Sequence, residues 1–130
     1  MTRLMKLLGT LAVAAGALTA CGGGSDPTPY GSVAWDASRP SAAITINYVT
    51  QEQANAAALE RCGGGACAVA LEFSGKGSCG AIAVGSGSPL VAGGGKGASQ
   101  GEAEAAAVSD CGAKGGGACS IPSSLPGKCM

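Results

Sequence analysis

The chain has 130 residues, a balanced charge and only four aromatic residues. Glycine occupies 24 positions, charged residues make up 12% of the chain, and histidine is absent. Without histidine the protein cannot use Ser-His-Asp or Cys-His nucleophile activation, or a zinc site that needs a histidine ligand. Eight basic residues balance eight acidic ones, so the excess of positive charge typical of nucleic-acid-binding proteins is missing.

The N-terminal segment has the composition of an export signal. Two basic residues precede an apolar run over residues 7–17 that is too short to span a bilayer comfortably. Residues 18–21 read Leu-Thr-Ala-Cys and resemble a bacterial lipobox, in which the cysteine is lipidated and the preceding peptide is removed. We therefore predict a lipoprotein signal peptide at residues 1–20 and lipidation of Cys21. The alternative is an ordinary signal peptide that is cleaved near Ala20.

A lipid on Cys21 would anchor the mature chain in the membrane of the bacterial cell envelope. Glycine rather than aspartate follows this cysteine, which by the sorting rule of enteric bacteria favours the outer membrane, facing the periplasm or the surface. Residues 21–29 are rich in glycine, serine and proline and predict a flexible tether. One folded domain is therefore expected at residues 30–129, in a mature chain with a net charge of about −2.

The first elements of the folded part are a hairpin and a helix. Runs of β-branched and aromatic residues at 32–35 and 42–48 are separated by a short loop, which predicts two antiparallel strands. Thr50 is followed three positions later by Gln53, a capping box that predicts the start of a helix. Three glycines from Gly63 predict its end, and the apolar run after them predicts a third strand over residues 67–73.

The second half of the chain repeats this pattern with a shift of 49 residues. The shift aligns Gly-Ser-Val-Ala at 31–34 with Gly-Ala-Ile-Ala at 80–83 and aligns Cys62 with Cys111. The sequence therefore indicates a tandem duplication with units at about 30–78 and 79–129. The expected fold is α+β: two ββα-β repeats that form one antiparallel sheet, with both helices on one face of it and disulfide bonds as staples.

Glycine and proline predict a looser second unit. Residues 93–99 read Gly-Gly-Gly-Lys-Gly-Ala-Ser, but Leu90 and Gly97 break the pattern of a phosphate-binding loop, so a flexible hairpin loop is the interpretation and no nucleotide is expected. Pro122 and Pro126 fall in the last predicted strand. Because proline cannot donate to a strand ladder, this strand should be an edge strand or irregular.

Six cysteines remain after the lipidated one, an even number that in an exported domain favours disulfide bonds. Metal binding and a redox dithiol are the alternatives, and no metal or cofactor is expected because the spacings lack C-x2-C and no histidine is present. Six cysteines allow 15 connectivities. The repeat favours one of them, in which each helix end is joined to the next strand and the two units are linked: Cys62–Cys67, Cys111–Cys119 and Cys79–Cys129.

Few side chains suggest a functional site. Glu102 and Glu104 lie two positions apart on a predicted helix and point to different faces, and strand alternation directs Glu72 outward, so no catalytic pair is predicted. Trp35 and Tyr48 could form an interaction surface, although so few aromatic residues in a small domain are more often part of its core.

Three segments resemble one bacterial family. They are Tyr-Gly-Ser-Val-Ala at 30–34, Arg-Cys-Gly-Gly-Gly-Ala-Cys-Ala-Val at 61–69 and Cys-Gly-Ala-Ile-Ala-Val-Gly at 79–85. Together they are similar to the family catalogued as domain of unknown function 4189, over residues 30 to about 129. The resemblance implies a small exported protein, in some members a lipoprotein, and offers no established activity or catalytic residue.

These observations favour a non-enzymatic protein-binding or protective module, similar in role to an inhibitor or immunity protein. Its expected partners are the membrane, through the lipid, and an envelope or exported protein, with no nucleic acid. The alternatives are a hydrolase that acts on the cell wall through carboxylates and a passive structural component of the envelope.

Overall fold

Two hairpins, each followed by a helix, organise the chain. The computed structural model describes residues 27–87 and 89–130, so the predicted signal peptide at 1–20 and the lipid site Cys21 lie outside the described residues. The elements follow one another as β1 (Tyr30–Asp36), β2 (Ser41–Tyr48), α1 (Gln51–Cys62), β3 (Ala68–Ser74), β4 (Cys79–Gly85), β5 (Ala92–Gly97), α2 (Gln100–Ala113), β6 (Cys119–Ser120) and β7 (Lys128–Cys129).

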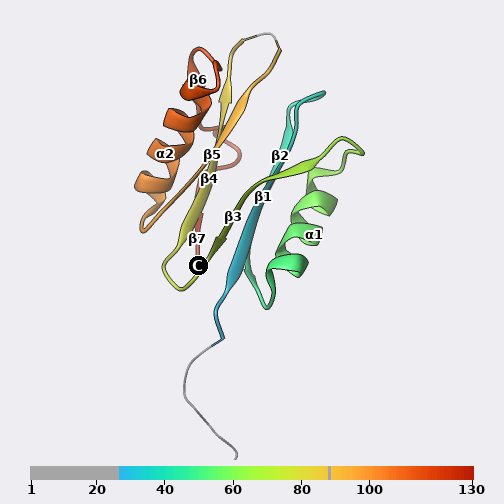
Figure 1. The fold of residues 1–130 in the computed structure, drawn as a ribbon, viewed down its shortest axis with the longest axis vertical. Coiled ribbons are helices and arrows are strands. Elements are labelled where there is room, and N and C mark those ends of the chain that lie inside the picture. The colour runs from blue at the N-terminus through green and yellow to red at the C-terminus, as the bar shows by residue number, and fades with distance from the viewer. Residues whose placement is uncertain (1–26, 88) are drawn as a thin grey trace, which may run out of the picture.

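The strands form two antiparallel sheets. One sheet has the order β2-β1-β3, and the other has the order β5-β4-β6, with β7 also paired to β4. The predicted α+β class is confirmed, but the expected single sheet with both helices on one face is wrong. Helix α1 contacts β1 and β2, whereas α2 contacts β4 and β5. In Figure 1 the two sheets lie between the two helices, which makes four layers.

The alternation of side chains along the strands explains the two sheets. Val33 packs with Ile44, Phe73 and Ile82 in a core between the sheets, whereas the next residue, Ala34, lies in a second core beneath α1. Successive strand residues point to opposite faces, so each hairpin has two apolar faces. The face lined with alanine packs against a helix, and the face with larger side chains packs against the other sheet.

The helices begin at the predicted residues. The Thr50 hydroxyl accepts a hydrogen bond from the Gln53 amide at 3.1 Å, and Ser99 does the same for Glu102 at 3.1 Å. Gly63 ends α1 with a φ of +78°, a left-handed conformation that glycine adopts without strain. Neither helix in the described part of the chain is long and apolar enough to cross a membrane.

The glycine-rich run at residues 93–99 was expected to be a flexible hairpin loop. This expectation is wrong, because most of the run lies in strand β5. A Cβ at Gly93 would overlap the backbone of α2 at Cys111, and one at Gly95 would overlap it at Ala107. Because only hydrogen occupies these positions, the helix backbone lies directly on the strand. The glycines are therefore required for close packing of the second half and do not loosen it.

The last predicted strand is interrupted, as its prolines indicated. β6 pairs with β4 at Val84 and Gly85, and β7 pairs with the other end of β4 at Cys79 and Gly80. Residues 121–127 between them, which include Pro122 and Pro126, form no strand. One edge of β4 is thus paired only at its two ends.

Candidate functional site

A groove of about 540 Å³ lies at the end of β4 where β6 pairs with it. It lies between the outer strand of one sheet, β2, and the outer strand of the other, β6. The groove lies at the end of β1 that carries Trp35, whereas the tether joins β1 at Tyr30. A strand of seven residues spans about 20 Å, so the groove lies at the far end of β1 from Tyr30, where the described chain enters the sandwich.

We call this hollow the end groove and define it by its lining. The first sheet and its hairpin loop contribute Trp35, Pro40, Ser41 and Ala42. The end of β4 contributes Val84, Gly85 and Ser86, and the C-terminal segment contributes Ala118, Ser120, Pro122, Ser124 and Leu125. None of these twelve residues is charged, and the polar side-chain groups are four serine hydroxyls and the indole N–H of Trp35. Apolar walls with a few polar groups are typical of binding pockets.

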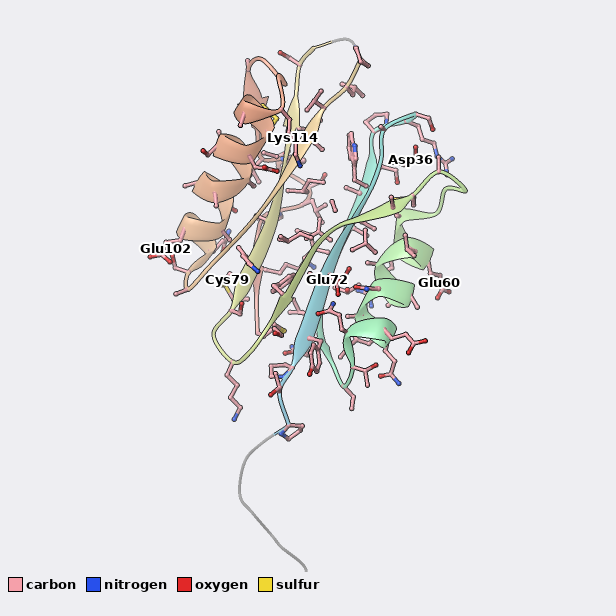
Figure 2. The ribbon with its side chains drawn as sticks, viewed as in Figure 1. Asp36, Glu60, Glu72, Cys79, Glu102 and Lys114 are labelled. Atoms are coloured by element: carbon pink, nitrogen blue, oxygen red, sulfur yellow. A yellow bond between two sulfur atoms is a disulfide. The ribbon has the colours of Figure 1, made fainter. Side chains whose placement is uncertain are left out.

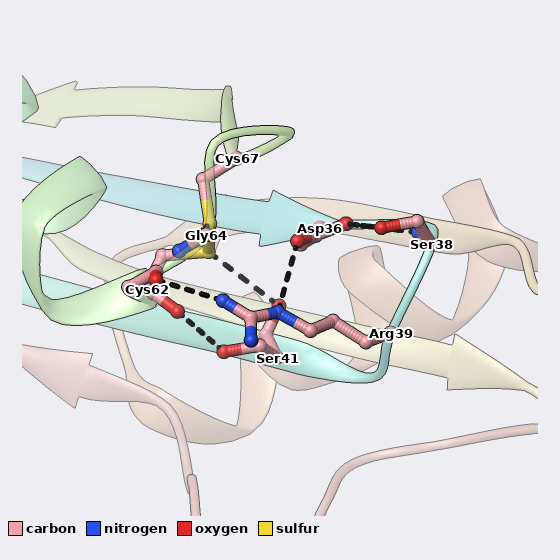
Figure 3. The surroundings of a disulfide bond; sticks show 8 residues. Asp36, Ser38, Arg39, Ser41, Cys62, Gly64 and Cys67 are labelled. Atoms are coloured by element: carbon pink, nitrogen blue, oxygen red, sulfur yellow. Dashed lines mark hydrogen bonds and ion pairs between the residues drawn. A yellow bond between two sulfur atoms is a disulfide. The ribbon is translucent and has the colours of Figure 1, made fainter.

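A network of polar contacts holds the hairpin loop that forms one wall (Figure 3). Asp36 is 1% exposed and accepts hydrogen bonds from the backbone amide of Ser38 at 2.9 Å and from its hydroxyl at 2.6 Å. Arg39 Nε lies 3.4 Å from Asp36 Oδ2, and Arg39 Nη2 donates to the Gly63 carbonyl at 2.7 Å. The hairpin loop is thus joined to the end of α1 before any ligand binds.

The same network sets the charge of Asp36. Hydrogen bonds from the Ser38 side chain, and then from its backbone, lower the pKa of the Asp36 carboxyl from its ordinary value of 3.8. The carboxylate therefore stays ionised at neutral pH and keeps Arg39 as its partner. Neither charge lines the groove.

Disulfide bonds fix the ends of both helices, and the end of α1 adjoins this network. The structure joins Cys62 to Cys67, Cys111 to Cys119 and Cys79 to Cys129, the three pairs that the repeat favoured. Ser41 in the groove wall donates to the Cys62 carbonyl at 2.6 Å, so the wall is hydrogen-bonded to one cysteine of the first disulfide. Among the described residues no group of three cysteine or carboxylate side chains is placed to hold a metal ion.

Trp35 and Tyr48 do not form one surface. Trp35 is paired with Ala42 at the loop end of the β1–β2 hairpin, whereas Tyr48 is paired with Tyr30 at the other end. Trp35 lines the end groove, and Tyr48 lines a separate hollow of about 110 Å³ near the tether. Of the two predicted interaction residues, only Trp35 therefore belongs to the candidate site.

The carboxylates considered for catalysis are dispersed. Glu72 is exposed on β3, and Figure 2 shows it well apart from Glu102 on α2. Glu102 accepts a hydrogen bond from the Ala98 amide at 2.9 Å, which gives it a capping role. Glu104 accepts hydrogen bonds from Gln100 at 3.0 Å and from the Gly127 amide at 2.9 Å, and these bonds, that from Gln100 first, lower its pKa. A general acid would need the opposite shift.

Most of the groove residues could not be recognised from the sequence. Val84, Ser120, Ser124 and Leu125 were not singled out, because serine and isolated aliphatic residues carry no chemical signature. One signal was available in the two prolines that flank Leu125: they interrupt a strand at the position where a third strand would complete the second sheet.

Comparison with curated proteins and with solved structures gives no match. Residues 30–125 match the model of the family described as a domain of unknown function (DUF4189). This match includes both hairpins, both helices and the groove residues up to Leu125. The chain therefore belongs to the DUF4189 family.

Proposed function

We propose that the protein is a non-enzymatic binding module, anchored to the bacterial envelope by a lipid on Cys21, that binds a partner protein through the end groove. The observation that carries the proposal is the groove itself, a hollow of about 540 Å³ whose twelve lining residues include no acid, base or cysteine. Such a lining offers shape and apolar contact to a ligand and supplies no base that could activate its serine hydroxyls for nucleophilic attack.

The position of the groove agrees with anchoring through the N-terminus. The described chain begins at Pro27, next to the start of β1, and the groove lies at the other end of that strand. A lipid on Cys21 would thus attach the domain at the end opposite the groove and leave the groove accessible to a partner. We place the module at the outer membrane, where an inhibitor-like or immunity-like protein would meet exported or envelope proteins.

Preorganisation of the wall favours binding over a passive structural role. The contacts among Asp36, Arg39 and Gly63, with the nearby Cys62–Cys67 disulfide, hold the hairpin loop in one arrangement. A rigid wall loses little conformational entropy when a ligand binds. A purely structural envelope component would have no need of a braced and open groove.

Site-specific photo-crosslinking in intact cells tests the proposal. A photoreactive amino acid in place of Ser124, which lines the groove, should crosslink to one specific protein. The control is the same replacement at the neighbouring Ser123, which is also exposed but does not line the groove. Equal crosslinking from both positions, or none from Ser124, would contradict a protein partner in the groove.

The anchor has its own test. The intact mass of the protein extracted from membranes should show a lipid-sized increment at Cys21, and thiol-alkylating reagents should react only after reduction. An unmodified mass would make the module a diffusible secreted domain, and free thiols in the native sample would contradict the disulfide scaffold.

A further inference from the structure

We infer that the end groove takes an extended, uncharged peptide segment of the partner, which binds along an open sheet edge and buries an apolar side chain against Trp35 and Leu125. This inference rests on the proposed function, because it names the chemistry of the ligand at the same site. It is carried by three features of the groove: the strands that form its walls, the absence of charge and the continuity with the core.

Each wall of the groove includes part of an outer strand: Ser41 and Ala42 begin β2, and Ser120 ends β6. β2 pairs with β1 on one side only, and β6 pairs with β4 on one side only. The backbone amides and carbonyls on the free side of an outer strand can pair with another extended chain. Proteins that bind peptides by strand addition use such an edge, with main-chain hydrogen bonds for affinity and side-chain pockets for selectivity.

The charge distribution selects an uncharged segment. None of the lining residues is charged. In the adjoining hairpin loop, Asp36 and Arg39 already pair with each other, and Arg39 also donates to the Gly63 carbonyl. A charged side chain in the groove would lose water without gaining a counter-ion. The exposed hydroxyls of Ser120 and Ser124 can donate to or accept from a peptide backbone or a neutral polar side chain.

The apolar part of the groove continues the core between the sheets. Trp35 and Leu125 line the groove and also pack, half-buried, against the cluster of Val33, Ile44, Phe73 and Ile82. An apolar side chain that enters from solvent would extend this cluster and cover the two half-buried residues. An extended segment with apolar residues at alternate positions supplies such a side chain while its backbone runs along the edge.

The only tryptophan of the chain lies in the groove, so its fluorescence reports directly on occupancy. The full mature protein is first screened on an array of capped octapeptides that includes uncharged, acidic and basic sequences. The best binders are then titrated while the emission of Trp35 is recorded. Each is compared with two versions that carry N-methyl groups on one or the other set of alternate amides, and a neutral N-acetylglucosamine tetramer serves as the saccharide probe.

We expect uncharged peptides with alternating apolar residues to give a saturable shift in Trp35 emission. N-methylation of the set of amides that faces the strand should weaken binding on the order of tenfold, because it removes backbone hydrogen bonds. Ser124→Arg should abolish the response, whereas Ser123→Arg, in the same exposed turn, should retain it. Circular dichroism confirms that both variants are folded.

The inference would be overturned by a response to the saccharide and to no peptide, by equal binding of both N-methylated sets and the parent peptide, or by preference for charged sequences. Silence of Trp35 with every probe would also overturn it. If Ser124 still crosslinks to a specific protein in cells, these failures refute only the extended-peptide ligand. If the crosslink is missing as well, the proposed function fails with it.

Discussion

Replacement of Gly95 by alanine tests the close contact between β5 and α2. The added methyl group would overlap the amide nitrogen of Ala107 and the carbonyl oxygen of Ala103. Both are backbone atoms within a helix and cannot move aside singly, so the helix as a whole must shift from the sheet. Insertion of one methylene-sized group into a packed core usually costs about 1–3 kcal/mol. Because the contact here is backbone on both sides, we expect about 3 kcal/mol, the upper end of that range.

A loss of this size is measurable against the whole stability of a small domain, which is about 5–15 kcal/mol. Urea denaturation of the oxidised protein should show the loss, and the melting temperature should fall by about 12 °C or more. Gly101→Ala and Gly112→Ala are the controls. They lie on the exposed side of α2 with nothing within 4 Å of the added atom, and they should be neutral or stabilising by up to about 1 kcal/mol. A Gly95→Ala protein as stable as these controls would refute the packing argument.

Three further predictions concern the rest of the scaffold. Replacement of Cys79 and Cys129 by serine opens a bridge across 50 residues and should lower the free energy of unfolding by about 4 kcal/mol in urea titrations; an unchanged midpoint would contradict its role as a staple. Phe73→Ala removes the ring from between the sheets and should cost about 3–5 kcal/mol; a loss below 1 kcal/mol would mean that the sheets do not pack through it. Because hydrogen bonds from Ser38 lower the pKa of Asp36 below 3.8, ionised Asp36 stabilises the fold at pH values above 3.8, and this contribution is lost as the pH falls through the folded pKa. Asp36→Asn should therefore show a shallower loss of stability below about pH 4, and an identical acid limb would contradict this assignment.

The sequence predicted the features that depend on neighbouring residues. Thr50 and Ser99 begin the two helices because the hydroxyl at the N-cap accepts a hydrogen bond from the amide three residues later. This pattern can be recognised from four consecutive residues. Gly63 ends α1 for a similarly local reason. The cysteine pairs of the structure are those that the 49-residue shift favoured, although the duplication itself stays a prediction.

The arrangement of layers could not be predicted in the same way. Alternation shows that Val33 and Ala34 point to opposite faces of β1, but it does not show what covers each face. The β5 glycines were misinterpreted because glycine is rare in strands and common in loops. Their role becomes visible only when the helix across from them is placed, since the backbone contact that excludes a side chain at Gly95 comes from residues that follow it in the sequence.

The groove arises where the two halves of the chain differ. Each half has the order strand, strand, helix, strand, but the first half completes its sheet with the seven-residue β3, whereas the second has only the two-residue strands β6 and β7. Pro122 and Pro126 lie between them, and neither can donate to the ladder of β4. A continuous strand here would pair the whole edge of β4 and leave less room beside β2. The same prolines therefore shorten the second sheet next to the hollow that we propose for binding, and under that proposal the difference between the two halves serves the function.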